Sequence, residues 1–367
     1  MRAPLPRRTL ALITVAVIGL GGTLAACGKN EAAPSPSAVK TPATATATAV
    51  VSAKPSAATK TAPPAVETSV WPLTGVPGEL VERPAVAYKI ENSPEARPQT
   101  GLEFADVVWE TIVEGGISRY VAVYHSQMPD EVGPVRSIRP MDGPITCPTH
   151  GLLAFSGGKT HFINVALGCG VQTLSMDFGA GGFYRVSGKA APHNVYSKPA
   201  DMLEQADEEH QKSPQQEFEF ATNLEKATVT TSGQAATSVA MTMSGGSHPN
   251  WEWDASGKWL RSEGSNPAMA ASGERLSAVN VVVMKVDVTY AEGHDAAGNP
   301  IPESWVVGEG EGLVLTGGKA LEIDWSKADR DKPLVLKTKD GNLVKLAPGN
   351  TWVEVMPKSQ GAWTINA

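Results

Sequence analysis

Cysteine, charge and long apolar runs are all scarce in this chain of 367 residues, and each shortage removes a class of protein. The three cysteines, Cys27, Cys147 and Cys169, include no CxxC spacing, which argues against a redox or zinc motif. The catalytic patterns GxSxG and HExxH are also missing. Charged residues make up 19% and hydrophobic residues 41% of the chain, a balance typical of a globular protein.

The chain is acidic, with a formal net charge of −7 at pH 7. Residues 1–26 contain three arginines and no acid, so their removal would take the formal charge to −10. Such a protein is poorly matched to nucleic acid or to anionic lipid headgroups. We therefore expect no nucleic-acid partner.

The N-terminus has the layout of a bacterial lipoprotein signal. Three arginines precede an apolar run over residues 10–20, and Cys27 follows the small residues of a Leu-Ala-Ala sequence. The run is about half of the ~20 residues that a membrane-spanning helix needs. We expect a signal peptide over residues 1–26 and an acylated, palmitate-bearing Cys27 that anchors the protein in the cell membrane, facing outward. Two or more acyl chains hold a protein stably in a bilayer.

The composition divides the rest of the chain into a tether and two folded regions. Residues 27–69 are rich in Ala, Thr, Pro and Ser and lack apolar periodicity, so we expect a disordered, lipid-anchored tether. Residues 70–212 carry most of the polar motifs, and residues 213–367 carry short alternating segments split by turn residues. We predict a mixed α+β or α/β domain followed by a β-rich domain.

Residues 70–212 interleave strand and helix patterns. Residues 86–90 and 152–155 are apolar strand candidates, and residues 105–112 and 120–125 flank a Gly-Gly turn, which predicts a hairpin. A helix is expected from Pro199 to about Glu209.

Residues 213–367 show β patterns. Asp340-Gly341 lies between two apolar runs, which is a strong hairpin signal, and residues 279–288 predict a buried strand. Seven of the nine tryptophans lie in this region. Core packing is the expectation for them, with a carbohydrate-stacking surface as the alternative.

The two remaining cysteines, Cys147 and Cys169, form an even pair in what would be an oxidising compartment. We predict a disulfide between them. The alternative is two buried free thiols.

Polar residues concentrate in a few motifs of the first region, where binding or catalytic groups are often placed. Arginine can bind carboxylates or phosphates through two parallel hydrogen bonds, and His, Asn and Gln can form hydrogen bonds with sugar or peptide groups. Alternatively, the arginines simply pair with nearby carboxylates. The candidate binding or catalytic residues are Glu91, Asn92, Arg97, Gln99, Asp106, Glu110, Glu114, Arg119, Arg136, Arg139, His193 and Asn194.

Several of these motifs resemble the YerB-like family of bacterial lipoproteins, which is built on a domain of unknown function. The resemblance runs from about residue 71 to the end of the chain and implies a two-part fold and an envelope location. It supplies no activity and no catalytic residue, and Cys147 and Cys169 are not part of its pattern. The matching segments include Trp71–Gly75, Lys89–Ser93, Glu95–Gln99, Val113–Gly116, Gly133–Ser137, Phe155–Gly158, Ala191–Asn194, Asn280–Val283 and Thr351–Val353.

The favoured function is a membrane-anchored envelope protein that binds cell-wall glycan or peptide, or a wall-synthesis partner. The alternative is a wall hydrolase that uses Glu91, Glu110 or Glu114 as acid and base, with His193 as a general base. Catalytic carboxylates would lie about 5–10 Å apart across an open cleft, whereas carboxylates tied to arginine would indicate a structural network. A metal site from Asp106, Glu110, Glu114 and His193 is a minor alternative, and we expect neither metal nor cofactor.

Overall fold

The computed structural model describes residues 69–295 and 297–367, which belong to one compact unit, Ala65–Ala367. The predicted signal peptide, the anchor at Cys27 and almost all of the predicted tether lie outside the described residues. Among the described residues, no helix is long and apolar enough to cross a membrane.

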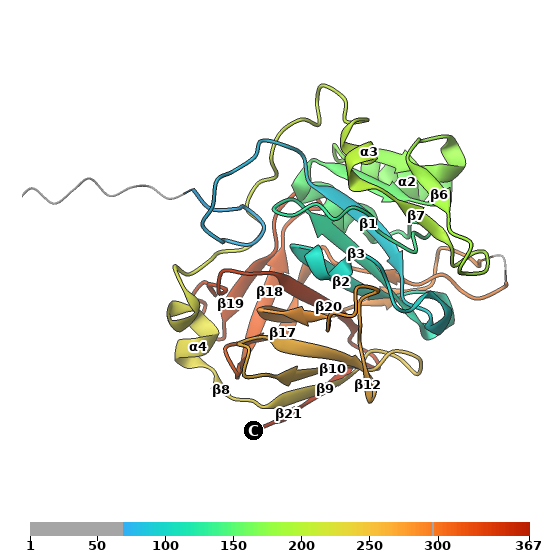
Figure 1. Cartoon of the computed structure of the whole chain (residues 1–367). Helices are drawn as coiled ribbons and strands as arrows, with labels where there is room; N and C mark the ends of the chain where they lie inside the picture. The colour runs from blue at the N-terminus through green and yellow to red at the C-terminus, as the bar shows by residue number, and fades with distance from the viewer. Residues whose placement is uncertain (1–68, 296) are drawn as a thin grey trace, which may run out of the picture. The chain divides into compact units, whose positions relative to one another are not determined.

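An eleven-stranded sheet forms the centre of this unit (Figure 1). Across the sheet, its strands are β19 (Val335–Thr338), β18 (Lys319–Lys327), β17 (Gly308–Thr316), β14 (Asn280–Val286), β20 (Thr351–Pro357), β2 (Val107–Ile112), β3 (Ser118–Tyr124), β1 (Val86–Glu91), β4 (Leu152–Phe155) and β5 (Gln172–Ser175), and β8 (Gln234–Ala235) pairs with β18. The strands β1, β4 and β5 are parallel neighbours, as are β2, β20 and β14. The β2–β20 pair joins the two regions expected from the sequence within one sheet.

A smaller sheet and two ribbons complete the β structure. The C-terminal region is β-rich, as predicted, and its strands are mostly antiparallel. The smaller sheet contains β12 (Asn266–Pro267), β11 (Trp259–Glu263), β10 (Pro249–Trp253), β9 (Ser238–Thr242) and β21 (Ala362–Asn366), with β13 (Ser277–Ala278) paired to β11. The ribbons are β6 (Phe183–Arg185) with β7 (Val195–Ser197), and β15 (Val288–Thr289) with β16 (Glu303–Ser304).

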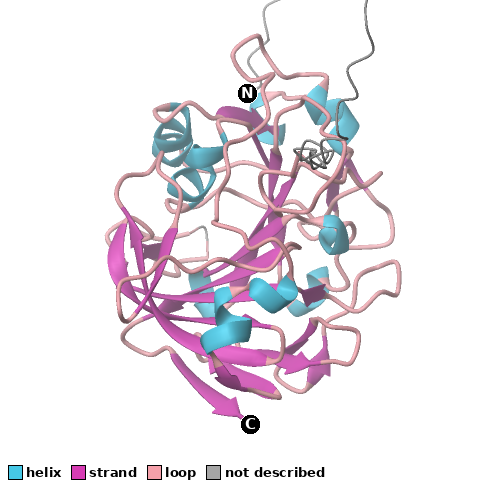
Figure 2. Ribbon diagram, turned by 90° about the vertical axis from the view of Figure 1, so that its left-hand side faces the viewer, coloured by secondary structure: helices cyan, strands magenta, loops and turns pink. Residues whose placement is uncertain are grey.

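The helices are few and short, as Figure 2 shows. The α-helices are α1 (Asp142–Thr146), α2 (Thr160–Leu167), α3 (Pro199–Leu203) and α4 (Thr228–Ser232), and single 3-10 turns cover Pro94–Ala96, Leu102–Phe104, Glu114–Gly116, Cys147–Thr149, Met176–Phe178 and Leu224–Lys226. The helix predicted to reach Glu209 ends at Leu203. Beyond it, the Asp207 carboxylate accepts hydrogen bonds from the backbone N–H groups of Glu209 and His210, which favours a turn over helix.

The large sheet buries both of its faces, because its strands alternate side chains between two cores. One face packs against α1 and α2 through side chains such as Ile145 and Phe162. The other face packs against the smaller sheet through Trp251 and Trp259. The mixed fold class predicted from the sequence is therefore confirmed. The buried tryptophans belong to the core, in agreement with the packing interpretation.

The predicted disulfide is present between Cys147 and Cys169, whose Cα atoms lie 5.6 Å apart. It ties the turn after α1 to the residues that follow α2. Closing a loop of this length contributes about 3 kcal/mol in the chain-entropy account.

A buried acid in the segment before α4 makes stability depend on pH. Burial raises the pKa of Glu217 to about 7 from a usual 4.5, and its carboxylate accepts a hydrogen bond from the Leu334 N–H at 3.2 Å. Burial lowers the pKa of the nearby Lys327 to about 8, so Lys327 titrates at higher pH than Glu217.

Because the folded state holds the Glu217 proton more tightly, its stabilising contribution is complete below pH 4.5 and is lost as pH rises through 7. The free energy of unfolding should fall by about 3 kcal/mol from this group over that range. Urea denaturation at pH 4.5 and pH 7.5 should show this fall reduced in Glu217→Gln, which keeps the hydrogen-bond acceptor. An equal fall in both proteins would contradict the assignment.

Candidate functional site

The polar motifs meet at one edge of the large sheet, where β1, β2 and β4 end. The segment of residues 133–139 crosses this edge and is held by backbone hydrogen bonds. The Glu91 N–H donates to the Pro134 carbonyl at 3.0 Å, and the Arg136 N–H donates to the Lys89 carbonyl at 2.8 Å. In open sheets with parallel strands, ligands bind outside the carboxyl ends of the strands, so the placement of these motifs is favourable for a binding site.

Glu91 is the centre of a half-exposed group on the face that carries α1 and α2. Its carboxylate lies 3.0 Å from His193 Nδ1 and 3.3 Å from Arg136 Nε, and it accepts a hydrogen bond from Ser93 Oγ at 3.2 Å. The Glu91 side chain is only 2% exposed, whereas those of Arg136 and His193 are about one-fifth exposed. These two side chains therefore form the solvent-facing rim of the group.

Two further arginines lie behind this rim. Arg139 makes a two-pronged ion pair with Glu114, with Nε–Oε1 at 2.5 Å and Nη2–Oε2 at 2.8 Å. Arg119, directly opposite Glu91 in the β1–β3 register, has no carboxylate partner among the described residues. We call Arg119, Arg136 and Arg139 the arginine cluster.

The unpaired guanidinium of Arg119 is buried, with the residue only 6% exposed. Its Nη1 donates to the Ser137 carbonyl at 3.3 Å, and its Nε meets no hydrogen-bond acceptor in the described part of the chain. Burial, followed by repulsion from Arg139 and Arg136, lowers the pKa of Arg119 to about 9. A buried cation in this state would be stabilised by an added anion.

A second, fully buried ion pair lies next to the arginine cluster. Lys89 Nζ lies 2.6 Å from the Asp142 carboxylate, and both side chains are fully buried. Burial lowers the pKa of Lys89, and Asp142 opposes that shift. The same carboxylate accepts the Arg139 backbone N–H at 2.7 Å, so it also fixes the start of α1.

A different polar group lies on the opposite face of the sheet, toward the smaller sheet. Glu110 accepts two hydrogen bonds from Arg261 Nη2, at 2.9 and 2.8 Å, and one from Ser118 Oγ at 2.6 Å. Glu354 lies beside Glu110 in the parallel β2–β20 register and accepts the Trp251 indole N–H at 2.9 Å.

The surroundings of Glu354 favour its neutral, protonated form. Burial and the neighbouring Glu110 carboxylate raise the pKa of Glu354 well above its usual value.

Arg261 also contacts two aromatic rings. Its guanidinium carbon lies 5.6 Å from the Tyr120 ring centre and 5.4 Å from that of Trp352, within cation–π distance.

The loop after β1 links the two faces. Arg97 Nε donates to Asn92 Oδ1 at 3.0 Å, and Gln99 Nε2 donates to the same atom at 3.1 Å and to the Glu91 carbonyl at 3.0 Å. Asn92 in turn donates to Ser118 Oγ at 2.8 Å. These amides and this guanidinium therefore hold the end of β1 in place.

Two candidate residues lie apart from this edge. Asp106 accepts the backbone N–H groups of His125 and Ser126 at 2.6 and 2.7 Å, at the start of β2. Asn194 accepts from Arg185 Nη1 at 2.7 Å within the β6–β7 ribbon. Both side chains have local structural partners.

Comparisons with known proteins agree with these motifs. Residues 73–212 match the model of the N-terminal domain of "Protein of unknown function (DUF3048)", and residues 239–353 match the model of its C-terminal domain. The chain belongs to the DUF3048 family. The predicted YerB-like resemblance is therefore confirmed.

A named relative and a solved structure extend this result. The DUF3048 protein is 27% identical over 297 residues to "Putative lipoprotein YerB" of Bacillus subtilis (strain 168), covering 79% of this chain and 87% of that one. Its fold matches the crystal structure of the YerB protein from Bacillus subtilis with a TM-score of 0.67 and 24% identity, covering 81% of this chain and 99% of that chain.

The carboxylates expected to serve a hydrolase are all engaged in this DUF3048 protein. Glu91 is held by Arg136 and His193, Glu110 by Arg261, and Glu114 by Arg139. The four residues that were considered for a metal site likewise contact four different sets of partners. By the geometric criterion stated above, this arrangement favours a network over a pair of free acid and base groups.

Sequence reasoning missed Lys89, Arg261 and Glu354, which carry much of this network. Each is a charged residue within a strand, on the same strand face as a buried apolar or aromatic neighbour two positions away. Arg261 follows Trp259 and Glu354 follows Trp352 in this way. That period of two was the signal available in the sequence.

The protonation of the buried pair can be tested by stability measurements. Arg261→Met should lower the free energy of unfolding by about 3–5 kcal/mol, because it leaves the Glu110 carboxylate buried without its cation partner. Glu354→Gln should change it by less than about 1 kcal/mol, because a neutral amide replaces a neutral acid. Chemical denaturation at pH 7 measures both, and equal losses would show that Glu354 is ionised.

Proposed function

We propose that this DUF3048 protein is a lipid-anchored protein of the cell envelope that binds an anionic group of the cell wall without catalysing its cleavage. The anchor is Cys27, which follows the lipoprotein-type signal in the sequence. The relative from Bacillus subtilis carries "lipoprotein" in its name, which supports the same location for this chain. The partners are the bilayer, through acylated Cys27, and a component of the wall.

The observation that carries the binding proposal is the unpaired, buried guanidinium of Arg119. The arginine cluster holds three positive charges against the carboxylates of Glu91 and Glu114, which leaves one positive charge in excess. A ligand with one negative charge would balance it. Arginine binds carboxylates with paired, charge-assisted hydrogen bonds.

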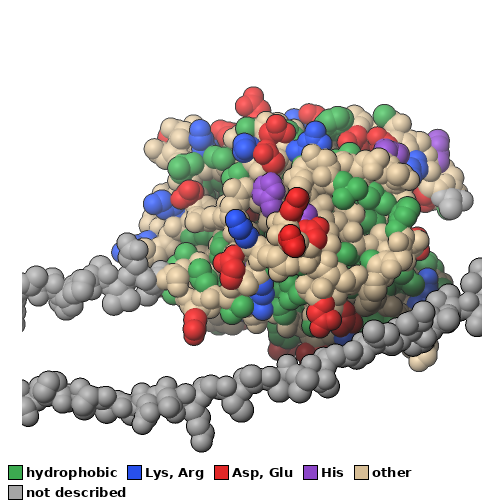
Figure 3. Space-filling view, turned by 90° about the horizontal axis from the view of Figure 1, so that it is seen from above, with side chains coloured by type: hydrophobic (Ala, Val, Ile, Leu, Met, Phe, Trp, Pro, Cys, Tyr) green, Lys and Arg blue, Asp and Glu red, His purple; other side chains and the backbone are tan. Residues whose placement is uncertain are grey.

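The ligand proposed for this site is the free carboxylate of a wall peptide. Arg136 and His193 at the solvent-facing rim would meet it first, and Arg119 would supply the charge behind them. On the face shown in Figure 3, acidic and basic side chains are interspersed. Engagement of Glu91, Glu110 and Glu114 by cations favours this binding role over hydrolysis.

The test uses the full-length chain in detergent, a wall stem peptide with a free carboxylate, and the same peptide as its carboxamide. Calorimetry should show the acid binding at least about tenfold more tightly than the amide, the size of one charge-assisted hydrogen bond. Arg136→Gln and Arg119→Gln should remove this preference. The matched control Arg185→Gln changes an exposed arginine of the adjacent ribbon and should keep it.

Purified peptidoglycan provides the second arm of this test. The wild-type chain should sediment with it without releasing soluble fragments, and Arg136→Gln should sediment less. Fragment release that the variants lose would make the protein an enzyme and overturn the proposal. Neither binding nor release would also overturn it and would direct the search to protein partners at the membrane.

A further inference from the structure

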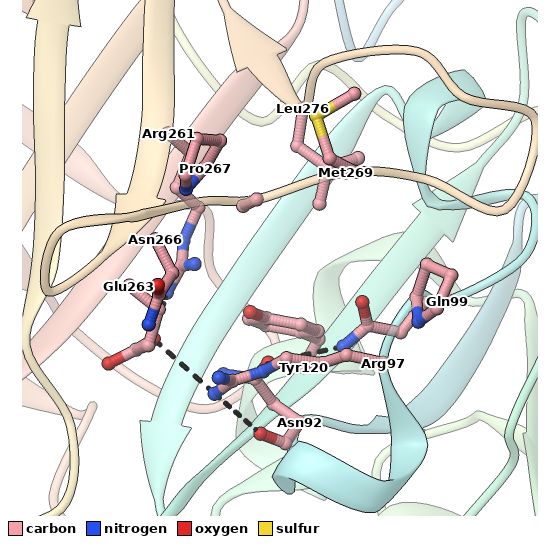
Figure 4. Close-up of a pocket in the computed structure, with 12 residues that line it drawn as sticks. Asn92, Arg97, Gln99, Tyr120, Arg261, Glu263, Asn266, Pro267, Met269 and Leu276 are labelled. Carbon is pink, nitrogen blue, oxygen red and sulfur yellow. Dashed lines mark hydrogen bonds and ion pairs between the residues drawn. The ribbon is translucent and has the colours of Figure 1, made fainter.

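A cavity of about 250 Å³ lies on the face of the sheet opposite the arginine cluster (Figure 4). It lies between the loop after β1 and the segment after β11. Backbone contacts hold these two segments together: Gln99 and Ala270 form a parallel bridge, and the Ala271 N–H donates to the Gln99 carbonyl at 2.7 Å. The cavity is therefore framed by parts of the chain that are about 170 residues apart in sequence and are fixed to each other.

One wall of the cavity is apolar. Met269, Leu276 and Pro98 contribute to it, and Figure 4 shows Met269 and Leu276 above the space. Met269 is 39% exposed although its side chain borders the cavity, so it lies at the entrance, whereas Leu276 is buried. A ligand in this space would cover the apolar surface of Met269, which contributes to affinity.

The charged groups of the cavity balance one another. Glu263 accepts a hydrogen bond from Arg261 Nη2 at 3.0 Å, and Arg97 Nη2 lies 3.7 Å from the same carboxylate. Arg261 is also paired with Glu110, and burial together with Glu110 raises the pKa of the neighbouring Glu354, which favours its neutral form. Two guanidinium groups thus face two carboxylates, which leaves no excess charge for an ionic ligand.

Hydrogen-bonding groups without a partner among the described residues remain available at the opposite wall. The Tyr120 hydroxyl and Gln99 Oε1 make no hydrogen bond to any other described side chain or backbone group, although both residues line the cavity. Arg97 engages Asn92 and Glu263 through Nε and Nη2, which leaves Nη1 without a partner in the described range. Donors and an acceptor thus lie across from an apolar wall.

We propose that this cavity binds a neutral secondary amide that carries a small apolar group, such as the acetamide of an N-acetylated sugar or an alanyl amide. The carbonyl would accept from Tyr120 or Arg97, the N–H would donate to Gln99 Oε1, and the methyl group would pack on Met269 and Leu276. Both sources share this chemistry. The site is separate from the carboxylate site proposed above, because it holds no excess charge and lies on the other face of the sheet.

The test measures binding to the full-length chain in detergent by saturation-transfer NMR and calorimetry. The probes are N,N′-diacetylchitobiose, cellobiose and N-acetylalanine methylamide. Cellobiose is a neutral disaccharide without the acetamide groups, so it should not bind. Binding of diacetylchitobiose assigns the site to glycan, and binding of the blocked alanine assigns it to peptide. Binding of cellobiose as tight as that of diacetylchitobiose, or no binding of either amide, would overturn the proposal.

Two variants and one control variant locate the binding in this cavity. Met269→Trp should fill the entrance and abolish amide binding, and Tyr120→Phe should weaken it about fivefold by removing one hydrogen bond. Leu343→Trp changes an exposed side chain that does not line the cavity and should bind as the wild type does. Circular dichroism confirms that each variant is folded. Unchanged binding by Met269→Trp would overturn the proposal.

Arg136→Gln separates the two proposed sites. It should lose the preference for a peptide carboxylate and keep the amide affinity, because Arg136 does not line the cavity. If the carboxylate site fails its own test, amide binding by the wild type would still stand. Loss of amide binding in Arg136→Gln would contradict a separate site and overturn this inference.

Discussion

The parallel pairing of β2 with β20 is the contact on which both the sheet and its polar interior depend. It places Glu110 beside Glu354 where water is excluded, and two ionised carboxylates could not share that position. The Arg261 guanidinium pairs with Glu110, and the raised pKa of Glu354 favours a neutral acid beside it, which together resolve the conflict. Because Arg261 comes from β11, the same charge balance fixes how the smaller sheet lies on the larger one.

The two polar groups at the edge of the sheet follow from the alternation of side chains along β1. Glu91 and Asn92 are adjacent in sequence, yet Glu91 contacts the arginine cluster and Asn92 contacts the network of Glu110 on the other face. Gln99 donates to both residues and so fixes the backbone between them. A short motif thereby supplies two faces with different chemistry: one carries an excess positive charge and the other is balanced.

The sequence predicted the elements of the fold more completely than the site. Local patterns were sufficient for β1, for the β2–β3 hairpin and for the β-rich C-terminal region, because alternation and turn residues are local signals. Beyond the end of α3 at Leu203, the side chain of Asp207 holds a turn in place of further helix, and sequence patterns weigh such side-chain contacts poorly. The pairing of β2 with β20 was not predictable, since nothing in either strand specifies a partner so distant in the chain.

The same reason limited the prediction of the site. The candidate residues near Glu91 were identifiable because they lie in dense motifs. Arg139 pairs with Glu114, which agrees with the alternative that the arginines pair with nearby carboxylates. Arg261, the cation that pairs with Glu110, lies 151 residues further along the chain and became visible only in three dimensions. Asp106, Glu110 and Glu114 are spaced four residues apart. Asp106 nevertheless has different partners, because it lies at the start of β2 and accepts backbone hydrogen bonds there.

The distance along the chain between β2 and β20 also has a consequence for how the protein folds. Roughly 240 residues separate the two strands, and closing so long a loop is entropically unfavourable until many other contacts have formed. Until Thr351–Pro357 are available, one edge of β2 has no neighbour and presents open backbone groups. A nascent chain would therefore carry a template for non-native strand pairing until β20 becomes available.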